Sequence, residues 1–195
     1  MASPDPIQLF LRYWKEAREK ADPVADALSL ATADAAGHPH VRTVLLKQVP
    51  DGRFGFVSRV GGKKHEHIAH QNDIECCTHW PTLNLQVRLR CKTETMDKES
   101  LGYFWSLRPR DAQIVYSMDF RQSEEISSFQ NLTEQFEKIK KQFQKIKAIP
   151  LSKFYVGYFL KPYSIEFLYP QKSRLNQRQL YILEDGQWLQ KFLAP

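Results

Sequence analysis

Two cations, Arg42 and Lys47, stand in a segment that otherwise has the pattern of a buried strand. Residues 41–49, VRTVLLKQV, place apolar side chains on both faces of a strand. A guanidinium and an ammonium inside such a strand have little water around them, and buried charges without partners are costly. We therefore expect an anion to meet these two side chains.

A second pair of cations, Lys63 and Lys64, opens a helix predicted over 63–70. Cations in the first turn of a helix are disfavoured by about 0.3–1 kcal/mol, because the helix dipole is positive there. A phosphate monoester would reverse this, since free backbone N–H groups, two ammonium groups and neighbouring glycines would all favour it. The alternative, two solvated lysines that tolerate a small penalty, stays open on the local sequence.

Two arginine-containing segments could add to an anion site. In a strand over 173–181, SRLNQRQLY, the side chains of Arg174, Asn176 and Arg178 would share one face. The other segment, SLRPRDAQ, carries two more arginines at 106–113. Surface ion pairing is the alternative for both segments, and such pairs contribute little to stability.

Asp111 is the acid within the second of these segments. It could pair with Arg108 or with Arg110. Either pair would be a local surface contact rather than a ligand site.

Other chemistries have little support. The sequence contains neither glycine-rich nucleotide-binding pattern. His65, His67 and His70 have no cysteine or carboxylate at ligand spacing, so no metal site is expected. No serine or cysteine stands in a nucleophile motif. If the protein is an enzyme, an organic cofactor is expected to supply its chemistry.

Turn signals divide the chain into many strands and a few helices. Helices are predicted over 5–20, 63–70, 98–107 and 124–147, with Ser123 as the cap of the last. Consecutive antiparallel strands predict a mainly β fold with α-helices, an α+β small closed barrel with the helices packed outside it. The predicted strands are 27–34, 40–49, 54–58, 74–80, 85–96, 154–160, 164–169 and a hairpin at 179–193.

Length and composition are those of an ordinary globular protein. The 195 residues predict a single domain, 1–195, with 42% hydrophobic and 26% charged residues. No apolar run approaches a membrane span and no secretory signal is visible, so no membrane partner is expected. Three cysteines suggest no disulfide framework and favour the cytoplasm. The net charge of +6 suits an anionic partner, but no nucleic-acid-binding motif accompanies it, so no nucleic acid is expected.

Taken together, the segments resemble the pyridoxine/pyridoxamine 5'-phosphate oxidase family. The motifs DPIQLFLRYW, RTVLLK, GGKKHEHI, LQVRLRCKTE, RPRDAQI, RQSEEIS, IEF, RLNQR and the terminal LAP occur in the family's order at nearly its spacing. The resemblance implies an FMN-binding split β-barrel and a homodimer with FMN where the subunits meet. It also implies oxidation of pyridoxamine or pyridoxine 5'-phosphate to pyridoxal 5'-phosphate, with O2 as the electron acceptor.

The resemblance implies two sets of FMN contacts. One set matches the phosphate-binding segment and its neighbours in the family: Arg42, Lys47, Ser58, Lys63 and Lys64. The other set matches contacts that the family largely takes from the partner subunit: Gln86, Gln122, Ser123 and Arg178.

The implied substrate site is less complete. Lys47, Arg108 and Arg174 match substrate-binding residues; Arg108 would anchor the phosphate, while Lys47 and Arg174 would orient the reacting end as the catalytic pair. Four positions depart from the family pattern, namely Phe104 for a Tyr, Ala112 for a Ser, Asn176 for a His and Leu168 for a Trp. Two alternatives therefore stay open: an FMN-dependent oxidase of another small molecule, and a non-catalytic flavin-binding protein.

Overall fold

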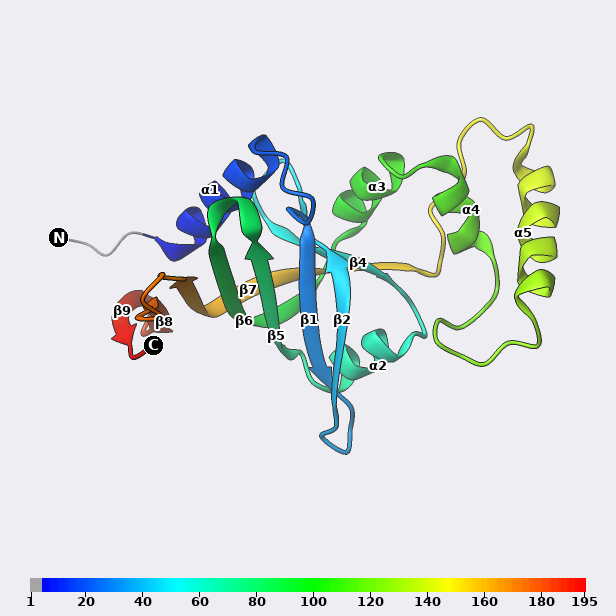
Figure 1. The fold of residues 1–195 in the computed structure, drawn as a ribbon. Coiled ribbons are helices and arrows are strands. Elements are labelled where there is room, and N and C mark those ends of the chain that lie inside the picture. Colours follow the sequence, from blue (N-terminus) through cyan, green and yellow to red (C-terminus); the bar gives the residue numbers. More distant parts are fainter. Residues whose placement is uncertain (1–4) are drawn as a thin grey trace.

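One antiparallel sheet of nine strands forms the body of the computed structural model, which describes residues 5–195 (Figure 1). Its main path runs β2-β1-β5-β6-β7-β4-β3, and the hairpin of β8 and β9 pairs with β7. The strands are β1 (Ala27–Ala33), β2 (Pro39–Leu45), β3 (Lys47–Gln48), β4 (Phe54–Arg59), β5 (Asp73–Trp80), β6 (Leu85–Thr95), β7 (Tyr155–Tyr169), β8 (Gln177–Glu184) and β9 (Gln187–Leu193).

Most of the helices lie at the two ends of this sheet, while α2 packs against β1 and β4 (Figure 1). Helix α1 covers one end, and α3, α4 and α5 follow one another away from the other end, with α5 outermost. Asp5 caps α1, because its Oδ1 accepts a hydrogen bond from the backbone N–H of Ile7 at 2.9 Å. The helices are α1 (Pro6–Glu19), α2 (Lys63–His70), α3 (Lys98–Ser106), α4 (Arg110–Ser117) and α5 (Phe129–Phe143), with a 3-10 turn at Pro81–Leu83.

The length of β7 gives the sheet its shape. Its first residues pair with β4 and its last residues pair with β8, while β6 runs beside it for most of its length. A register shift in β6 between Arg90 and Cys91 allows the pair to bend. One strand therefore connects the barrel to the C-terminal hairpin.

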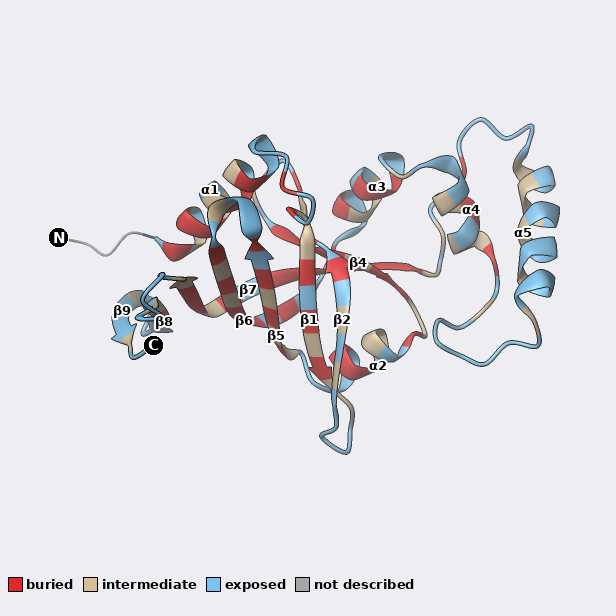
Figure 2. Ribbon diagram, in the orientation of Figure 1, coloured by how far each residue is buried: buried red, intermediate tan, exposed pale blue. Residues whose placement is uncertain are grey.

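Two hydrophobic clusters hold these elements (Figure 2). In the larger one, α1 buries Phe10 and Trp14 against the sheet, and the ring centroids of Phe10 and Trp80 lie 5.8 Å apart. The smaller cluster joins α3 and α4 to β7 through Trp105, Ile114 and other apolar residues. The helical end is thus a separately packed unit on the same sheet, and burial of its apolar surface fixes α4 beside β7.

The barrel is split rather than closed, which corrects the prediction of a small closed barrel. The strand path begins at β2 and ends at β3, and no ladder of described residues joins these two ends. The expected strand over 40–49 is divided at Leu46, which is 2% exposed. Strand β2 buries only Val44 among its residues, so Arg42 does not lie in a strand covered on both faces; Val41 beside it is 70% exposed.

The helical predictions need two further corrections. Helix α4 was not predicted: no helix was expected between 107 and 124, and Pro109 is the residue that precedes it. The last helix was predicted over 124–147 but runs from Phe129 to Phe143. Its cap is Ser128, whose side chain accepts from the N–H of Asn131, while Ser123 has a φ of 72° and lies in the preceding loop.

Candidate functional site

A cluster of two cations and a hydroxyl lies where β4 meets α2. The Nζ of Lys64, in the first turn of α2, donates to Oγ of Ser58 at 2.8 Å. Burial, and to a smaller extent the nearby charge of Arg42, lowers the pKa of Lys64. The positive charges of Lys64 and Arg42 repel each other in this half-buried place. Their arrangement is therefore favourable only when an anion binds beside them.

Arg42 is held in this cluster from the neighbouring strand. Its Nη1 donates to Oγ1 of Thr32 at 2.6 Å and to the carbonyl of His40 at 3.0 Å. Burial lowers its pKa as well. Within residues 5–195, no carboxylate forms an ion pair with Arg42 or Lys64. The two cations therefore lie together without a carboxylate partner among these residues, so they could bind an anion.

The turn before α2 brings a distant segment to the same place. A Cβ added to Gly62 would lie 3.2 Å from both Cβ and Oε1 of Gln122, so the two backbones approach closely because Gly62 has no side chain. Gln122 thus lies beside the turn before α2 of its own chain, and Ser123 follows it in the same loop. Lys63 is exposed at the edge of the same turn.

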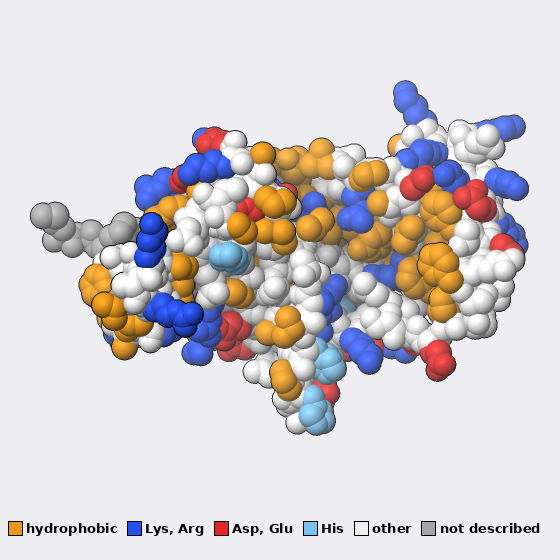
Figure 3. Space-filling view, viewed as in Figure 1, with side chains coloured by type: hydrophobic (Ala, Val, Ile, Leu, Met, Phe, Trp, Pro, Cys, Tyr) orange, Lys and Arg blue, Asp and Glu red, His pale blue; other side chains and the backbone are white. Residues whose placement is uncertain are grey.

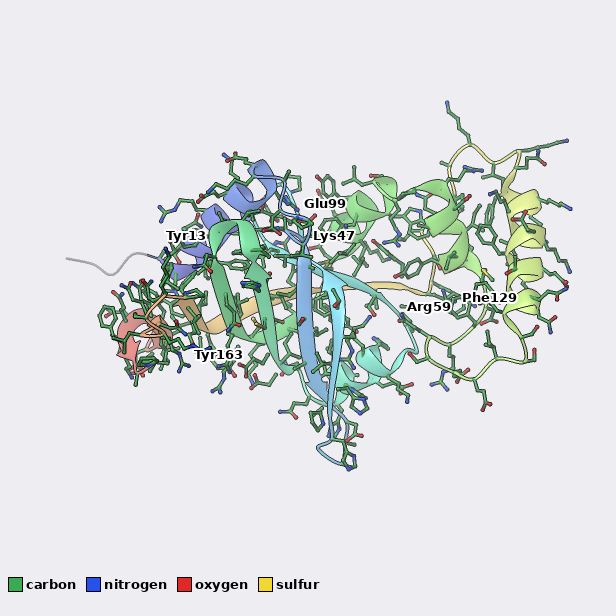
Figure 4. The ribbon with its side chains drawn as sticks, viewed as in Figure 1. Tyr13, Lys47, Arg59, Glu99, Phe129 and Tyr163 are labelled. Atoms are coloured by element: carbon green, nitrogen blue, oxygen red, sulfur yellow. The ribbon has the colours of Figure 1, made fainter. Side chains whose placement is uncertain are left out.

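Arg59 fastens this loop to the sheet, and sequence reasoning missed it. The side chain is 4% exposed, and its Nε donates to the carbonyl of Phe120 at 2.9 Å. Its Nη1 and Nη2 donate to the carbonyls of Val115 and Met118. Figure 4 shows Arg59 between β4 and the loop that leads from α4 to α5. Its partners are backbone groups 56 to 61 residues away, so no side-chain pattern could reveal them.

We expect an Arg59→Met variant to lower the free energy of unfolding by roughly 1–3 kcal/mol, because three carbonyls lose their donor. FMN affinity should fall with stability, since the loop that carries Gln122 is no longer held. Urea denaturation of the FMN-free protein measures the first effect. A variant as stable as the parent would show that the carbonyls find other donors.

A cavity of about 450 Å³ opens between the sheet and the helical end. Figure 3 shows Lys and Arg side chains in the hollow on this face, and Figure 4 places Lys47 at the junction of the sheet with α3. Burial, and then the charge of Arg108, lowers the pKa of Lys47. The wall also includes Arg18, Asp26, Leu45, Leu46, Gln48, Val57, Phe104, Leu107, Pro109 and Tyr116.

The guanidinium of Arg108 borders this cavity and could bind an anion there. Its guanidinium carbon lies 4.7 Å from the ring centroid of Tyr116 and 5.4 Å from that of Tyr155. It forms no ion pair with a carboxylate of residues 5–195, and its Nε is buried without a hydrogen-bond partner. Asp111 pairs with Lys140 at 3.0 Å instead, which corrects the expectation that it serves Arg108 or Arg110. Arg110 donates to the carbonyl of Ile146 at 2.7 Å.

One carboxylate stands among the cations of the cavity wall. Asp26 Oδ1 accepts from Nε of Arg18 at 2.6 Å and from Nε1 of Trp14 at 2.9 Å. Its charge partly offsets the effect of Arg108 on Lys47. Among the cations of the wall, Arg18 is therefore paired with Asp26, while Lys47 and Arg108 form no ion pair with a carboxylate of the described residues.

The cavity lacks two hydroxyl donors that the family pattern would supply, because this chain has Phe104 in place of a Tyr and Ala112 in place of a Ser. Phe104 lies on the wall and is 4% exposed, but it has no hydroxyl. Ala112 is half-buried on α4 and is not part of the wall. The groups of the cavity wall that could bind an anion are therefore the charged side chains of Lys47 and Arg108.

The remaining predicted residues form a second group near β8. Gln86 on β6 lies opposite Leu168 on β7, which lies opposite Arg178 on β8. Nε of Arg178 donates to Oε1 of the buried Glu166 at 2.8 Å. None of these residues lines the cavity that contains Lys47 and Arg108. The structure therefore divides the predicted site into three groups within one chain: the cluster around Lys64, the cavity with Lys47 and Arg108, and the residues near β8.

Arg174 and Asn176 do not share a strand face with Arg178, which corrects that prediction. Strand β8 begins at Gln177, and Arg174 precedes it with a φ of 62° in a turn. Asn176 Oδ1 accepts a hydrogen bond from the N–H of Gln171 at 3.0 Å and so closes this turn. Neither residue lines the cavity.

The described residues show neither a metal-binding group nor a membrane span. No three His, Cys, Asp or Glu side chains of residues 5–195 are placed to hold a metal ion. His65 and His67 bond to Tyr158 and Thr32, respectively. No helix in the same range combines the length and apolar character needed to cross a membrane.

Family models match nearly the whole chain. The model described as pyridoxamine 5'-phosphate oxidase matches residues 16–143, and the one described as pyridoxine 5'-phosphate oxidase C-terminal dimerisation region matches residues 155–195. A pyridoxine/pyridoxamine 5'-phosphate oxidase of Shewanella sediminis is 35% identical over 98% of this chain and 89% of its own length. One from Alteromonas mediterranea is 34% identical over 97% and 89%.

Solved structures share the fold at lower identity. PhzG from Burkholderia lata 383, in complex with tetrahydrophenazine-1-carboxylic acid, has a TM-score of 0.89 and 21% identity, covering 99% of this chain and 94% of its own. An FMN-binding protein from Nostoc punctiforme, related to pyridoxamine 5'-phosphate oxidase, has a TM-score of 0.77 and 17% identity, covering 99% of both chains. The split-barrel fold predicted from the sequence is confirmed.

Proposed function

Because the chain belongs to the pyridoxamine 5'-phosphate oxidase family, we propose that it oxidises pyridoxamine or pyridoxine 5'-phosphate to pyridoxal 5'-phosphate, with O2 as the electron acceptor. Its class is that of an FMN-dependent oxidoreductase, and FMN is its cofactor. The observation that carries the substrate proposal is the partnerless guanidinium of Arg108, which lies with Lys47 on one cavity wall.

The cation cluster suits the phosphate of FMN. Lys64 and Arg42 are half-buried and lack a carboxylate partner among the described residues, and Ser58 adds a hydroxyl. A phosphate monoester carries nearly two negative charges, so it would compensate both cations. When bound, FMN accepts a hydride from the substrate.

The substrate would lie in the cavity beside this cluster. Arg108 holds its phosphate, because a guanidinium matches two phosphate oxygens at once. Lys47 contacts the substrate from β3 and helps to orient its reacting end. In this proposal Arg174 and Arg178 act on the site of the other subunit, since both lie in the group away from the cavity and within the dimerisation region.

FMN affinity is expected to fall as the pH rises through the pKa of Lys64, which lies below the usual 10.5. The bound phosphate favours the charged ammonium, so FMN binding takes up a proton once the free protein has lost it. Binding is therefore strongest below this pKa and weakens above it. Fluorescence titration of the FMN-free protein, from neutral pH to about pH 10, measures the effect.

A Lys64→Arg variant is the control for this pH dependence. Its guanidinium stays charged across the range, so the decline in affinity should disappear. An unchanged decline in this variant would assign the titration to another group.

A second candidate keeps FMN but changes the substrate to another anionic small molecule. Phe104 and Ala112 remove two hydroxyl donors that would help to bind a phosphate. PhzG, which shares the fold, was solved with a carboxylic acid. A carboxylate needs fewer donors than a phosphate, and a single guanidinium can bind both of its oxygens.

A Phe104→Tyr variant distinguishes the two candidates. If the cavity binds B6 phosphates, the added hydroxyl should contribute about 0.5–1.5 kcal/mol, and KM should fall several-fold with little change in kcat. Ala112→Ser should have a smaller effect, because Ala112 is not on the cavity wall. Phe129→Tyr is the matched control, since Phe129 is 76% exposed on α5.

Steady-state oxidation of both B6 phosphates by FMN-loaded protein provides the measurement. A parent that barely turns over, with no gain from Phe104→Tyr, would favour the second candidate.

A further inference from the structure

Two polar atoms beside the cavity are buried without hydrogen-bond partners in the described chain: Nε of Arg108 and the hydroxyl of Tyr155. Tyr155 stands at the start of β7, and its ring faces the Arg108 guanidinium. Two unsatisfied polar atoms on neighbouring side chains are costly in a packed interior. Because these two atoms lie next to the cavity, the free energy that their unsatisfied burial costs needs an explanation.

The rings around Arg108 form a rigid enclosure. The ring planes of Tyr116 and Tyr155 are perpendicular, at 88° and 4.9 Å between centroids. Trp105 packs edge-on against Tyr155 at 5.1 Å, and its Nε1 donates to the carbonyl of Ile149 at 2.8 Å. Because the ring centroids of Tyr116 and Tyr155 are about as close to each other as each is to the Arg108 guanidinium carbon, both rings lie on the same side of the guanidinium, which also borders the cavity.

Both tyrosines are neutral at physiological pH. Burial raises the pKa of Tyr116 and of Tyr155, and the opposing charge of Arg108 is the smaller influence on each. The Tyr155 oxygen is thus a hydroxyl that can accept the Nε–H of Arg108. This leaves the two terminal nitrogens of the guanidinium for the ligand.

We propose that Tyr155 is a positioning residue for Arg108, and that its hydroxyl accepts the Nε–H bond when an oxyanion such as a phosphate monoester occupies the cavity. The inference rests on the proposed function, because it concerns the same anion-binding end. Tyr116, which is on the cavity wall, contacts the guanidinium beside Tyr155. The two tyrosines thereby support the anion site in which Phe104 and Ala112 provide no hydroxyl.

Tyr155→Phe is the test, because it removes the hydroxyl and keeps the ring. Inorganic phosphate is titrated calorimetrically into FMN-loaded protein, where the FMN site is already filled. We expect phosphate to bind the variant about tenfold more weakly, which corresponds to about 1.4 kcal/mol. Without phosphate, the Tm of the variant should equal or exceed that of the parent, since a buried unsatisfied hydroxyl is gone.

Tyr163→Phe is the matched control on the same strand. Its hydroxyl already donates to Oδ1 of Asp73 at 2.7 Å, so the variant should lose stability and keep its phosphate affinity. Arg108→Ala should abolish phosphate binding. Phosphate binding that is unchanged in Tyr155→Phe, absent from the parent, or retained in Arg108→Ala would overturn the proposal. A parallel loss of Tm and affinity in Tyr155→Phe would also overturn it, because a purely structural role gives that result.

The outcome is separate from that of the proposed function. If phosphate binding follows the expected pattern but pyridoxamine 5'-phosphate is not oxidised, the positioning role stands and the proposed substrate is wrong.

Discussion

A Lys64→Ala variant is expected to bind FMN roughly 10- to 150-fold more weakly than the parent. The estimate follows from about 1.5–3 kcal/mol for a hydrogen bond with a charged group. Lys64 already donates to Ser58 and has no carboxylate partner in the described chain, so its charge is available to the phosphate. The fold should persist, because alanine favours helices and a half-buried cation is removed.

Fluorescence titration of FMN with FMN-free protein measures this loss. Lys63→Ala is the matched control, since Lys63 is the exposed neighbour in the same turn. Its effect should be clearly smaller. Equal losses in the two variants would mean that general positive charge, rather than the cluster with Arg42 and Ser58, retains the cofactor.

An Arg108→Ala variant is expected to lose roughly 30-fold to several-thousand-fold in kcat/KM, which corresponds to about 2–5 kcal/mol for a truncated charge pair. Within residues 5–195 the Arg108 guanidinium has no hydrogen-bond or ion-pair partner, so it is available to the ligand. In the variant no other side chain takes its place at the cavity wall. FMN affinity should stay close to that of the parent, because the cation cluster around Lys64 is intact.

Arg110→Ala provides the control for this prediction. Arg110 lies two residues away, but its guanidinium donates to the carbonyls of Phe143 and Ile146 and holds the end of α5. We expect KM to be unchanged in this variant. A comparable rise in KM for Arg110→Ala would contradict the assignment of Arg108 as the specific anion-binding group.

Local signals predicted the part of the site that is built locally. The helix at 63–70 was predicted with its bounds, because the glycine pair before it separates it from the preceding strand. The Lys64–Ser58 contact joins two neighbouring elements; the residue pattern singled out Lys64, and Ser58 came from the resemblance alone. The prediction that Asp185 and Gly186 form a hairpin turn is confirmed for the same reason.

Contacts made by backbone atoms over long distances could not be predicted. Arg59 binds carbonyls, which every residue carries, so no partner residue type marks it in the sequence. The position of Gln122 beside Gly62 depends on how the loop before α5 folds back, and the sequence places the helix cap five residues too early. Arg174 was assigned to a strand by alternation alone, although the turn that Asn176 closes begins before it.

The resemblance assigned Gln86 and Arg178 to the FMN site, although residue pattern and spacing alone give no reason to place them there. Gln86 and Arg178 lie on opposite sides of β7 and away from the cavity, so one chain gives no reason to group them with Lys47. The dimerisation region at 155–195 includes Arg178 and Arg174. A site completed by a second subunit is the arrangement that would unite these groups.

Anaerobic mixing of the FMN-loaded protein with pyridoxamine 5'-phosphate tests the proposed function most directly. Loss of the flavin's yellow absorbance in a single turnover, followed by its return when O2 is admitted, is the predicted result. Arg108→Ala protein with the same FMN content should bleach far more slowly under identical conditions. If the FMN of the parent protein stays bound and oxidised in the presence of pyridoxamine and pyridoxine 5'-phosphates, the proposed function is wrong.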